Sequence, residues 1–182
     1  PGRMRCVARS VAAAAYQKVL SIEPRNAPAR WNLGIVELLM GNLESGWPHL
    51  EAGWEIGERT SRRLTDKPLW RGESLTGKTL FIRPEQGFGD AIQMARFFGS
   101  LAKKAGCLVV ETPTSLSKLF RNCLDENIIF VEEGGEIPPY DLQCPLMSLP
   151  WAMNLKFSDL PGPMPYLSPP HEDCLFWEAN LG

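Results

Sequence analysis

The first third of the chain carries apolar side chains at helical spacing. Leu43, Trp47, Leu50 and Trp54 recur at steps of three and four residues, which places all four along one face of a helix. Such a stripe is typical of a helix face that packs into a protein core. Earlier in the chain, the apolar run over residues 11–15 is too short for a signal peptide and predicts part of another helix.

The pattern changes after residue 67. Residues 67–78 contain proline and glycine without any periodicity, which predicts a connector between two units. Short apolar runs then predict strands that are buried on both faces. These runs are residues 79–82 and 108–110, and the apolar residues 128–131 predict a third strand.

Helical patterns lie between the predicted strands. The first begins after Gly89 and ends near Gly106, and the apolar positions that should face the core are Ile92, Ala95, Phe98, Leu101 and Ala105. A second helix is expected over residues 115–123. Strands that alternate with helices through short connections predict a parallel, right-handed βαβαβ sheet.

The pattern weakens beyond residue 132. Nine prolines fall between Pro138 and Pro170, which predicts loops with short elements. Within this region, Tyr140-Asp141-Leu142 is a candidate fourth strand, and residues 171–181 have a helix-like spacing.

The helical stripe belongs to a repeat. An offset of about 34 residues aligns Ala12 with Gly46, Tyr16 with Leu50 and Leu20 with Trp54. This period, together with Asn32-Leu33-Gly34, resembles the tetratricopeptide repeat (TPR), in which small residues let paired helices approach closely. Glu37 and Gly53 depart from the repeat pattern, which favours an aromatic residue and an alanine there.

Composition narrows the possible partners. The net charge of -2 is spread along the chain, so we expect no nucleic-acid partner, and no apolar run is long enough for a transmembrane segment. The five cysteines lack metal-ligand spacing and favour a reducing, cytoplasmic location. With only His49 and His171 present, we expect no metal centre and no His-based triad.

Two glycine-rich segments match short nucleotide-binding expressions. Residues 72–79 match the phosphate-binding P-loop expression, but they precede a strand instead of opening a helix. Gly87-Phe88-Gly89 begins like a dinucleotide fingerprint, with Glu111 as the possible ribose-binding acid, although Ile92 stands where the third glycine belongs. An NAD-binding, Rossmann-type oxidoreductase is therefore a less favoured hypothesis.

A third interpretation uses several blocks together. Residues 68–73, 77–80, 85–97, 141–150, 165–167 and 177–182 occur in an order that resembles bacterial TPR-linked, heptosyltransferase-like glycosyltransferases with the two-domain GT-B fold. The central block is Glu85-Gln-Gly-Phe-Gly-Asp90-Ala-Ile-Gln. Phe98 departs from the family, which usually carries tyrosine at that position.

The resemblance implies a fold and a reaction. It implies TPR-like helical hairpins over residues 1–67, followed over 68–182 by the Rossmann-like, acceptor-side half of a GT-B fold. The reaction is inverting sugar transfer from a nucleotide-sugar to a glycan or protein acceptor, without a further cofactor. The resemblance also implies that the donor domain would follow Gly182, so we expect residues 1–182 to be inactive alone.

Site residues follow from the same block. The resemblance implies that Asp90 is the general base, and the helix dipole should favour its ionised form. Residues expected to bind substrate are Glu85, Gln86, Gly87, Gly89 and Arg96.

Two alternatives stay open. Asp90 is also explained as an ordinary helix cap, since aspartate is common at helix starts. The whole chain is also explained as a TPR-type interaction module that binds a peptide partner and uses the α/β part only as a platform.

Overall fold

A computed structural model describes residues 2–61, 65–85, 87–123, 127–160 and 164–181, with side chains described from Val7 onward except that of Cys123. The chain forms two compact units. The helical unit comprises Pro1–Thr60 and Pro150–Leu160, and the sheet unit comprises Ser61–Leu149 and Pro161–Gly182. The return of 150–160 to the helical unit is not evident in the sequence pattern. The predicted division at residues 67 and 68 stays a prediction.

Four helices open the helical unit. They are α1 (Gly2–Ile22), α2 (Ala27–Leu39), α3 (Leu43–Leu50) and α4 (Gly53–Ile56). Helix α2 begins at a well-formed cap, because the Asn26 side chain accepts a hydrogen bond of 2.9 Å from the Ala29 backbone N–H. Helix α2 packs against both α1 and α3 and is therefore the centre of this unit.

Two glycines let α2 and α3 approach closely. A Cβ atom on Gly34 would lie 2.9 Å from the Gly46 carbonyl oxygen, and one on Gly46 would lie 2.7 Å from a methyl carbon of Leu38. The close approach expected at these two positions is confirmed. Glu37 belongs to the same interface: its buried carboxylate lies 2.9 Å from Nδ1 of His49.

The stripe over residues 43–54 does not form one helix. Helix α3 contains Pro48 and ends at Leu50, and the chain turns before the short helix α4. Leu43 is buried, whereas Trp47 and Trp54 are half-buried. The Arg59 guanidinium lies 4.6 Å from the Trp54 ring centroid and covers part of that indole. The TPR identity of these helices stays a prediction.

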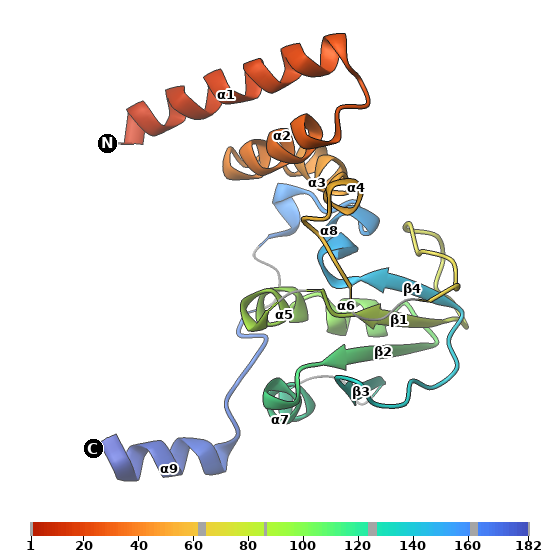
Figure 1. Ribbon diagram of the computed structural model, residues 1–182. Coiled ribbons are helices and arrows are strands. Elements are labelled where there is room, and N and C mark those ends of the chain that lie inside the picture. Colours follow the sequence, from red (N-terminus) through yellow and green to blue (C-terminus); the bar gives the residue numbers. More distant parts are fainter. Residues whose placement is uncertain (1, 62–64, 86, 124–126, 161–163, 182) are drawn as a thin grey trace. The chain divides into compact units, whose positions relative to one another are not determined.

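The sheet unit is built on four parallel strands. They are β1 (Thr79–Arg83), β2 (Cys107–Thr112), β3 (Ile128–Glu132) and β4 (Leu142–Pro145), in the order β3-β2-β1-β4 (Figure 1). The parallel α/β class is confirmed. The fourth strand starts at Leu142 instead of Tyr140. Just before it, the ring centroids of Tyr140 and Phe81 lie 4.9 Å apart, and the Asp141 carboxylate accepts a 2.7 Å hydrogen bond from the Thr79 N–H.

The core of the sheet unit lies around β1 and β2. Three consecutive residues of β1, Leu80 to Ile82, are fully buried, so both faces of the strand are covered. An aromatic cluster joins two helices to the sheet, with ring centroids 6.1 Å apart for Phe98 and Phe120 and 5.9 Å apart for Phe120 and Phe130. This cluster packs α6 and α7 against β3.

The predicted helix over residues 89–106 is divided. It forms α5 (Phe88–Ala95) and α6 (Phe98–Ala102), and the next helix is α7 (Thr114–Cys123). The break at Arg96 and Phe97 lets the adjacent rings of Phe97 and Phe98 both be buried. The prediction that Ile92 faces the core is wrong, because its side chain is 36% exposed while Ala91 and Met94 are buried.

The remaining elements are short except for the last. They are η1 (Leu146–Ser148), α8 (Leu149–Ala152), η2 (Phe157–Asp159) and α9 (His171–Leu181). The ammonium group of Lys118 on α7 pairs with Glu172 and Asp173 at the start of α9. In the described part of the chain, no helix combines the length and the apolar character that crossing a membrane requires.

The close approach of α2 and α3 makes a prediction about stability. The Gly34→Ala substitution should lower the free energy of unfolding by about 1 to 3 kcal/mol, because the new methyl group meets backbone atoms of α3. Chemical denaturation followed by circular dichroism measures this change. Gly99→Ala is the matched control, since a Cβ there has no heavy atom within 4 Å. Equal stability of the two variants would contradict the packing described for α2 and α3.

Candidate functional site

The candidate site lies where the strand order of the sheet reverses. Strands β2 and β3 follow β1 on one side, and β4 pairs with β1 on the other side. Ligands of open parallel sheets bind at the carboxyl ends of the strands at such a point. Glu85 follows β1, and its Oε1 accepts a 2.9 Å hydrogen bond from the backbone N–H of Met147, which follows β4. This bond joins the two loops on either side of the reversal.

Asp90 lies in the first turn of α5 but is not the cap of that helix. The N-cap residue is Gly87, whose φ of -71° and ψ of -174° are extended, and no side chain caps the helix. Asp90 is therefore the third helical residue. Among the described residues, none donates a hydrogen bond to its carboxylate. The interpretation of Asp90 as the helix cap is thus wrong. The oxygens of its carboxylate can accept hydrogen bonds from another group.

Burial and a neighbouring charge both favour the protonated form of Asp90. Partial burial raises the pKa of its carboxyl group above the ordinary value, and the nearby negative charge of Glu85 raises this pKa further. The helix dipole alone would lower the pKa. The raised pKa is opposite to the direction expected from the helix dipole, and its two causes are burial and the charge of Glu85.

Two glycines at the start of α5, the N-cap Gly87 and Gly89 in the first turn, leave open space near Asp90. A Cβ atom on Gly87 or on Gly89 would meet no heavy atom within 4 Å, and neither residue has a positive φ. Neither internal packing nor a left-handed backbone therefore requires glycine at these positions. The space is available to a ligand that approaches the backbone. Gln86, the remaining predicted residue of the β1–α5 loop, lies outside the described residues.

Arg96 has partners other than the two carboxylates. Its Nε donates a 3.0 Å hydrogen bond to the Gln93 carbonyl, and its guanidinium lies 5.0 Å from the Tyr166 ring centroid. In the part of the chain that the structure describes, no hydrogen bond or ion pair joins Arg96 to Glu85 or Asp90. The structure thus brings Glu85 and Asp90 together and leaves Arg96 beside Tyr166, a partner that residue spacing does not reveal.

An exposed apolar pair flanks the candidate base. Phe88 is 56% exposed and Ile92 is 36% exposed, and their spacing of four residues places them on one side of α5. Sequence reasoning missed this pair because it assigned Ile92 to the core. A helical pattern that places Ala91, Met94 and Ala95 in the core, instead of Ile92, would have predicted the exposed pair.

Residues 72–79 and Glu111, which match parts of nucleotide-binding sequence patterns, have structural roles. Residues 72–79 lead directly into β1, so this segment does not place a phosphate-binding loop at a helix start. Glu111 is a buried residue within β2, and its Oε1 accepts a 2.9 Å hydrogen bond from the Gly134 N–H. That bond holds the turn after β3, where Gly134 has a φ of +83°.

Within the described residues, no group of three or more histidine, cysteine or acidic side chains is arranged to hold a metal ion. Comparison with family models, with curated proteins and with solved structures found no match. The geometry of the site and the sequence blocks are therefore the basis on which a function is inferred.

The two carboxylates make a prediction about titration. Glu85→Gln should lower the pKa of Asp90, because the substitution removes a negative charge and keeps the side-chain oxygen that accepts from Met147. The pKa should stay above its ordinary value, since burial is the larger cause of the shift. Carboxyl-carbon NMR titration of Asp90 measures the change.

Glu73 is the internal control for this titration. The Arg71 backbone N–H hydrogen bonds to its carboxylate and holds the pKa of Glu73 below the ordinary value. This pKa should be unaffected by Glu85→Gln. An unchanged Asp90 pKa in the variant would show that the two carboxylates do not interact.

Proposed function

We propose that this chain supplies the acceptor side of an inverting glycosyl transfer in which Asp90 is the general base. The observation that carries the proposal is the carboxylate pair at the strand-order reversal. There, Asp90 has a raised pKa and, within the described residues, accepts no hydrogen bond. A carboxylate that is a stronger base than usual and has free acceptor capacity is suited to removing a proton from a bound hydroxyl.

The proposed step transfers one glycosyl group. The acceptor hydroxyl loses its proton to the Asp90 carboxylate while its oxygen forms a bond to the anomeric carbon of a nucleotide-sugar. The bond between that carbon and the diphosphate breaks, and the nucleoside diphosphate leaves with the bonding electron pair. Attack from the face opposite the leaving group inverts the anomeric configuration.

Residues around Asp90 have separate roles in this proposal. Glu85 keeps the β1–α5 loop joined to the loop after β4 and raises the basicity of Asp90. Gly87 and Gly89 leave room for the acceptor to approach the backbone. The exposed rings and methyl groups of Phe88 and Ile92 offer an apolar surface to the C–H face of a sugar.

The acceptor is a glycan or a protein side chain that carries a hydroxyl group. In the GT-B arrangement that the sequence blocks resemble, a second Rossmann-like domain holds the nucleotide-sugar, and the reaction takes place between the two domains. The proposal assigns only the acceptor half to residues 68–182. A cytoplasmic location is part of the same proposal, since it fits the scattered cysteines.

A second candidate function is a protein-interaction module on the helical unit. Helix α1 leaves Val7, Val11 and Val19 exposed, by 61%, 65% and 38%, at helical spacing. An apolar stripe of this kind fits a partner helix or a neighbouring repeat. This candidate requires no catalysis and predicts that substitution of Asp90 has no effect on the function of the protein.

Substitution of the proposed base separates the two candidates. Asp90→Asn should lower the rate of sugar transfer by the whole protein by about 10² to 10⁴-fold, because the amide does not accept the proton. The rate is measured with saturating acceptor, so that weaker binding does not mimic the effect.

Asp66→Asn is the matched control for this experiment. It removes an exposed carboxylate of the sheet unit that has no role in the proposal, and it should leave the rate unchanged. Wild-type transfer by the Asp90→Asn variant would eliminate Asp90 as the base.

The assignment of the donor half makes a separate prediction. Residues 1–182 alone should show no micromolar affinity for UDP-, GDP- or ADP-sugars in calorimetric titration, and no transfer, because the groups that stabilise the leaving diphosphate belong to the other domain. A dissociation constant near micromolar would place the donor site within this chain and refute the assignment of residues 68–182 to the acceptor side.

A further inference from the structure

We propose that Arg96 binds an anionic group of the acceptor, a carboxylate or a phosphate carried by a sugar, and that Tyr166 holds Arg96 in position for this contact. The ligand lies along the exposed side of α5 that carries Phe88 and Ile92. The role of this ligand as the acceptor rests on the proposed function, whereas the binding itself requires neither Asp90 nor a transfer reaction.

The guanidinium of Arg96 is held from two directions. Its Nε donates a 3.0 Å hydrogen bond to the carbonyl of Gln93, three residues earlier in the chain. Its central carbon lies 5.0 Å from the centroid of the Tyr166 ring, which is a cation–π contact. The side chain is also half-buried. Because these contacts already fix the guanidinium, little conformational freedom is lost when a ligand binds to it.

The two terminal nitrogens of Arg96 are not engaged by the protein. Among the residues that the structure describes, no hydrogen bond or ion pair reaches them. A guanidinium only donates hydrogen bonds and keeps its positive charge at neutral pH. Its planar fork matches the two oxygens of a carboxylate or a phosphate, with two parallel hydrogen bonds. The group that completes Arg96 is therefore an oxyanion.

The side of α5 that carries Arg96 is open to a ligand. Phe88, Ile92 and Arg96 follow one another at steps of four residues, which places them in one row along the helix. Phe88 and Ile92 are exposed, and a Cβ on the neighbouring Gly89 would meet no heavy atom within 4 Å. The helical rise places Arg96 about 6 Å beyond Ile92 along the axis. A sugar ring over Ile92 thus brings a charged substituent to Arg96.

The row of side chains defines the chemistry of the ligand. A cationic ligand is repelled by Arg96, and a neutral sugar leaves the guanidinium without a charged partner. An inorganic anion binds Arg96 but makes no use of the apolar surface of Phe88 and Ile92. A sugar acid or a sugar phosphate combines the C–H face of a ring with an oxyanion, so it contacts the whole row.

The position of Arg96 also bears on the size of the acceptor. Asp90 and Arg96 are six residues apart, which separates them by about 9 Å along α5 and places them on different sides of the helix. The reacting hydroxyl and the anionic group therefore belong to different parts of the acceptor. This spacing fits an acceptor of more than one sugar.

The test follows the Nε–H signal of Arg96 and the backbone amide signals of Ile92 and Gln93 by ¹H–¹⁵N NMR in the full chain. The probes are glucuronate, glucose 6-phosphate and glucose, which share one ring and differ in the group at its sixth carbon. At least one of the two anionic sugars should shift these signals saturably, and glucose should bind at least about tenfold more weakly. The anionic sugar that binds more tightly identifies the group as a carboxylate or a phosphate.

Substitutions separate charge from positioning. Arg96→Gln should weaken binding of the anionic sugar about tenfold or more, because it removes the charged hydrogen bonds. Arg96→Lys should have an intermediate effect, since an ammonium group keeps the charge and loses the fork. Tyr166→Leu should weaken binding about threefold or more and speed the exchange of the Arg96 Nε proton with water. Tyr166→Phe keeps the ring and should retain wild-type binding.

Two controls make the result specific. Lys104→Gln removes an exposed cation of the same unit and should leave the affinity unchanged. Asp90→Asn should not weaken the binding, so a failure of the anion site is distinguished from a failure of the proposed transfer. The proposal is overturned if neither anionic sugar shifts the signals, if glucose binds as tightly, or if the Arg96→Gln or Tyr166→Leu variant binds as wild type does. Tighter binding of UDP-glucose than of both anionic sugars would also overturn it, because the site would then belong to the donor.

Discussion

The double pairing of β1 is the constraint on which the sheet unit depends. β1 is hydrogen bonded to β2 on one edge and to β4 on the other, and three consecutive residues of it are fully buried. Its register therefore determines where both neighbouring strands end. Because β4 reaches β1 from the side opposite β2, the loops after β1 and β4 meet, and the Glu85 carboxylate bonds to the Met147 N–H. The carboxylate site is a consequence of this topology.

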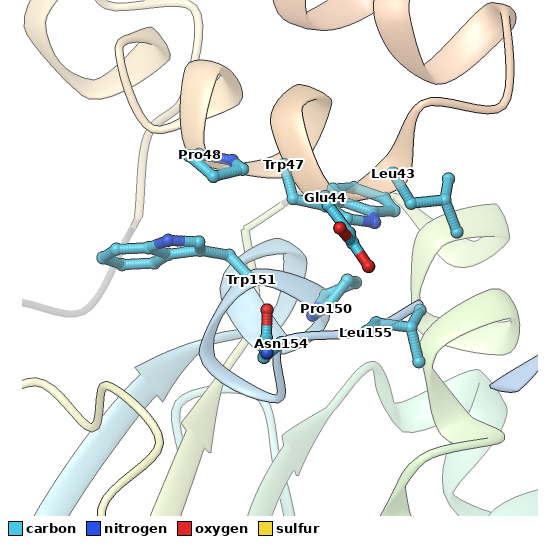
Figure 2. A pocket seen from close by; sticks show the side chains of 8 residues that line it. All are labelled: Leu43, Glu44, Trp47, Pro48, Pro150, Trp151, Asn154 and Leu155. Carbon is cyan, nitrogen blue, oxygen red and sulfur yellow. The ribbon is translucent and has the colours of Figure 1, made fainter. Parts of the chain in front are cut away.

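The helical unit depends on close packing at one interface. Glycines at positions 34 and 46 bring α2 and α3 together, and the buried pair of Glu37 and His49 lies in the same interface. A large side chain at either glycine would separate the helices. The packing also orients α3, whose residues Glu44 and Trp47 line a small pocket (Figure 2).

The chemistry of the candidate site depends on the surroundings of Asp90. Asp90 is partly desolvated next to another carboxylate, which raises its pKa and suits it to proton transfer.

The sequence by itself determined the first three strands and the α/β class. Apolar runs located β1, β2 and β3. Continuous apolar sequence is expected of strands buried on both faces, which holds for β1 and β2, whereas Ile129 of β3 is 42% exposed. The loop after β1 followed from its place between a strand and a helix. Only the tertiary structure decided that α5 and α6 are separate, that Ile92 is exposed and that the Asp90 pKa is raised. It alone joined α3 to residues 150–155. These features arise from contacts between residues far apart in the chain, and periodicity along the chain carries no information about such contacts.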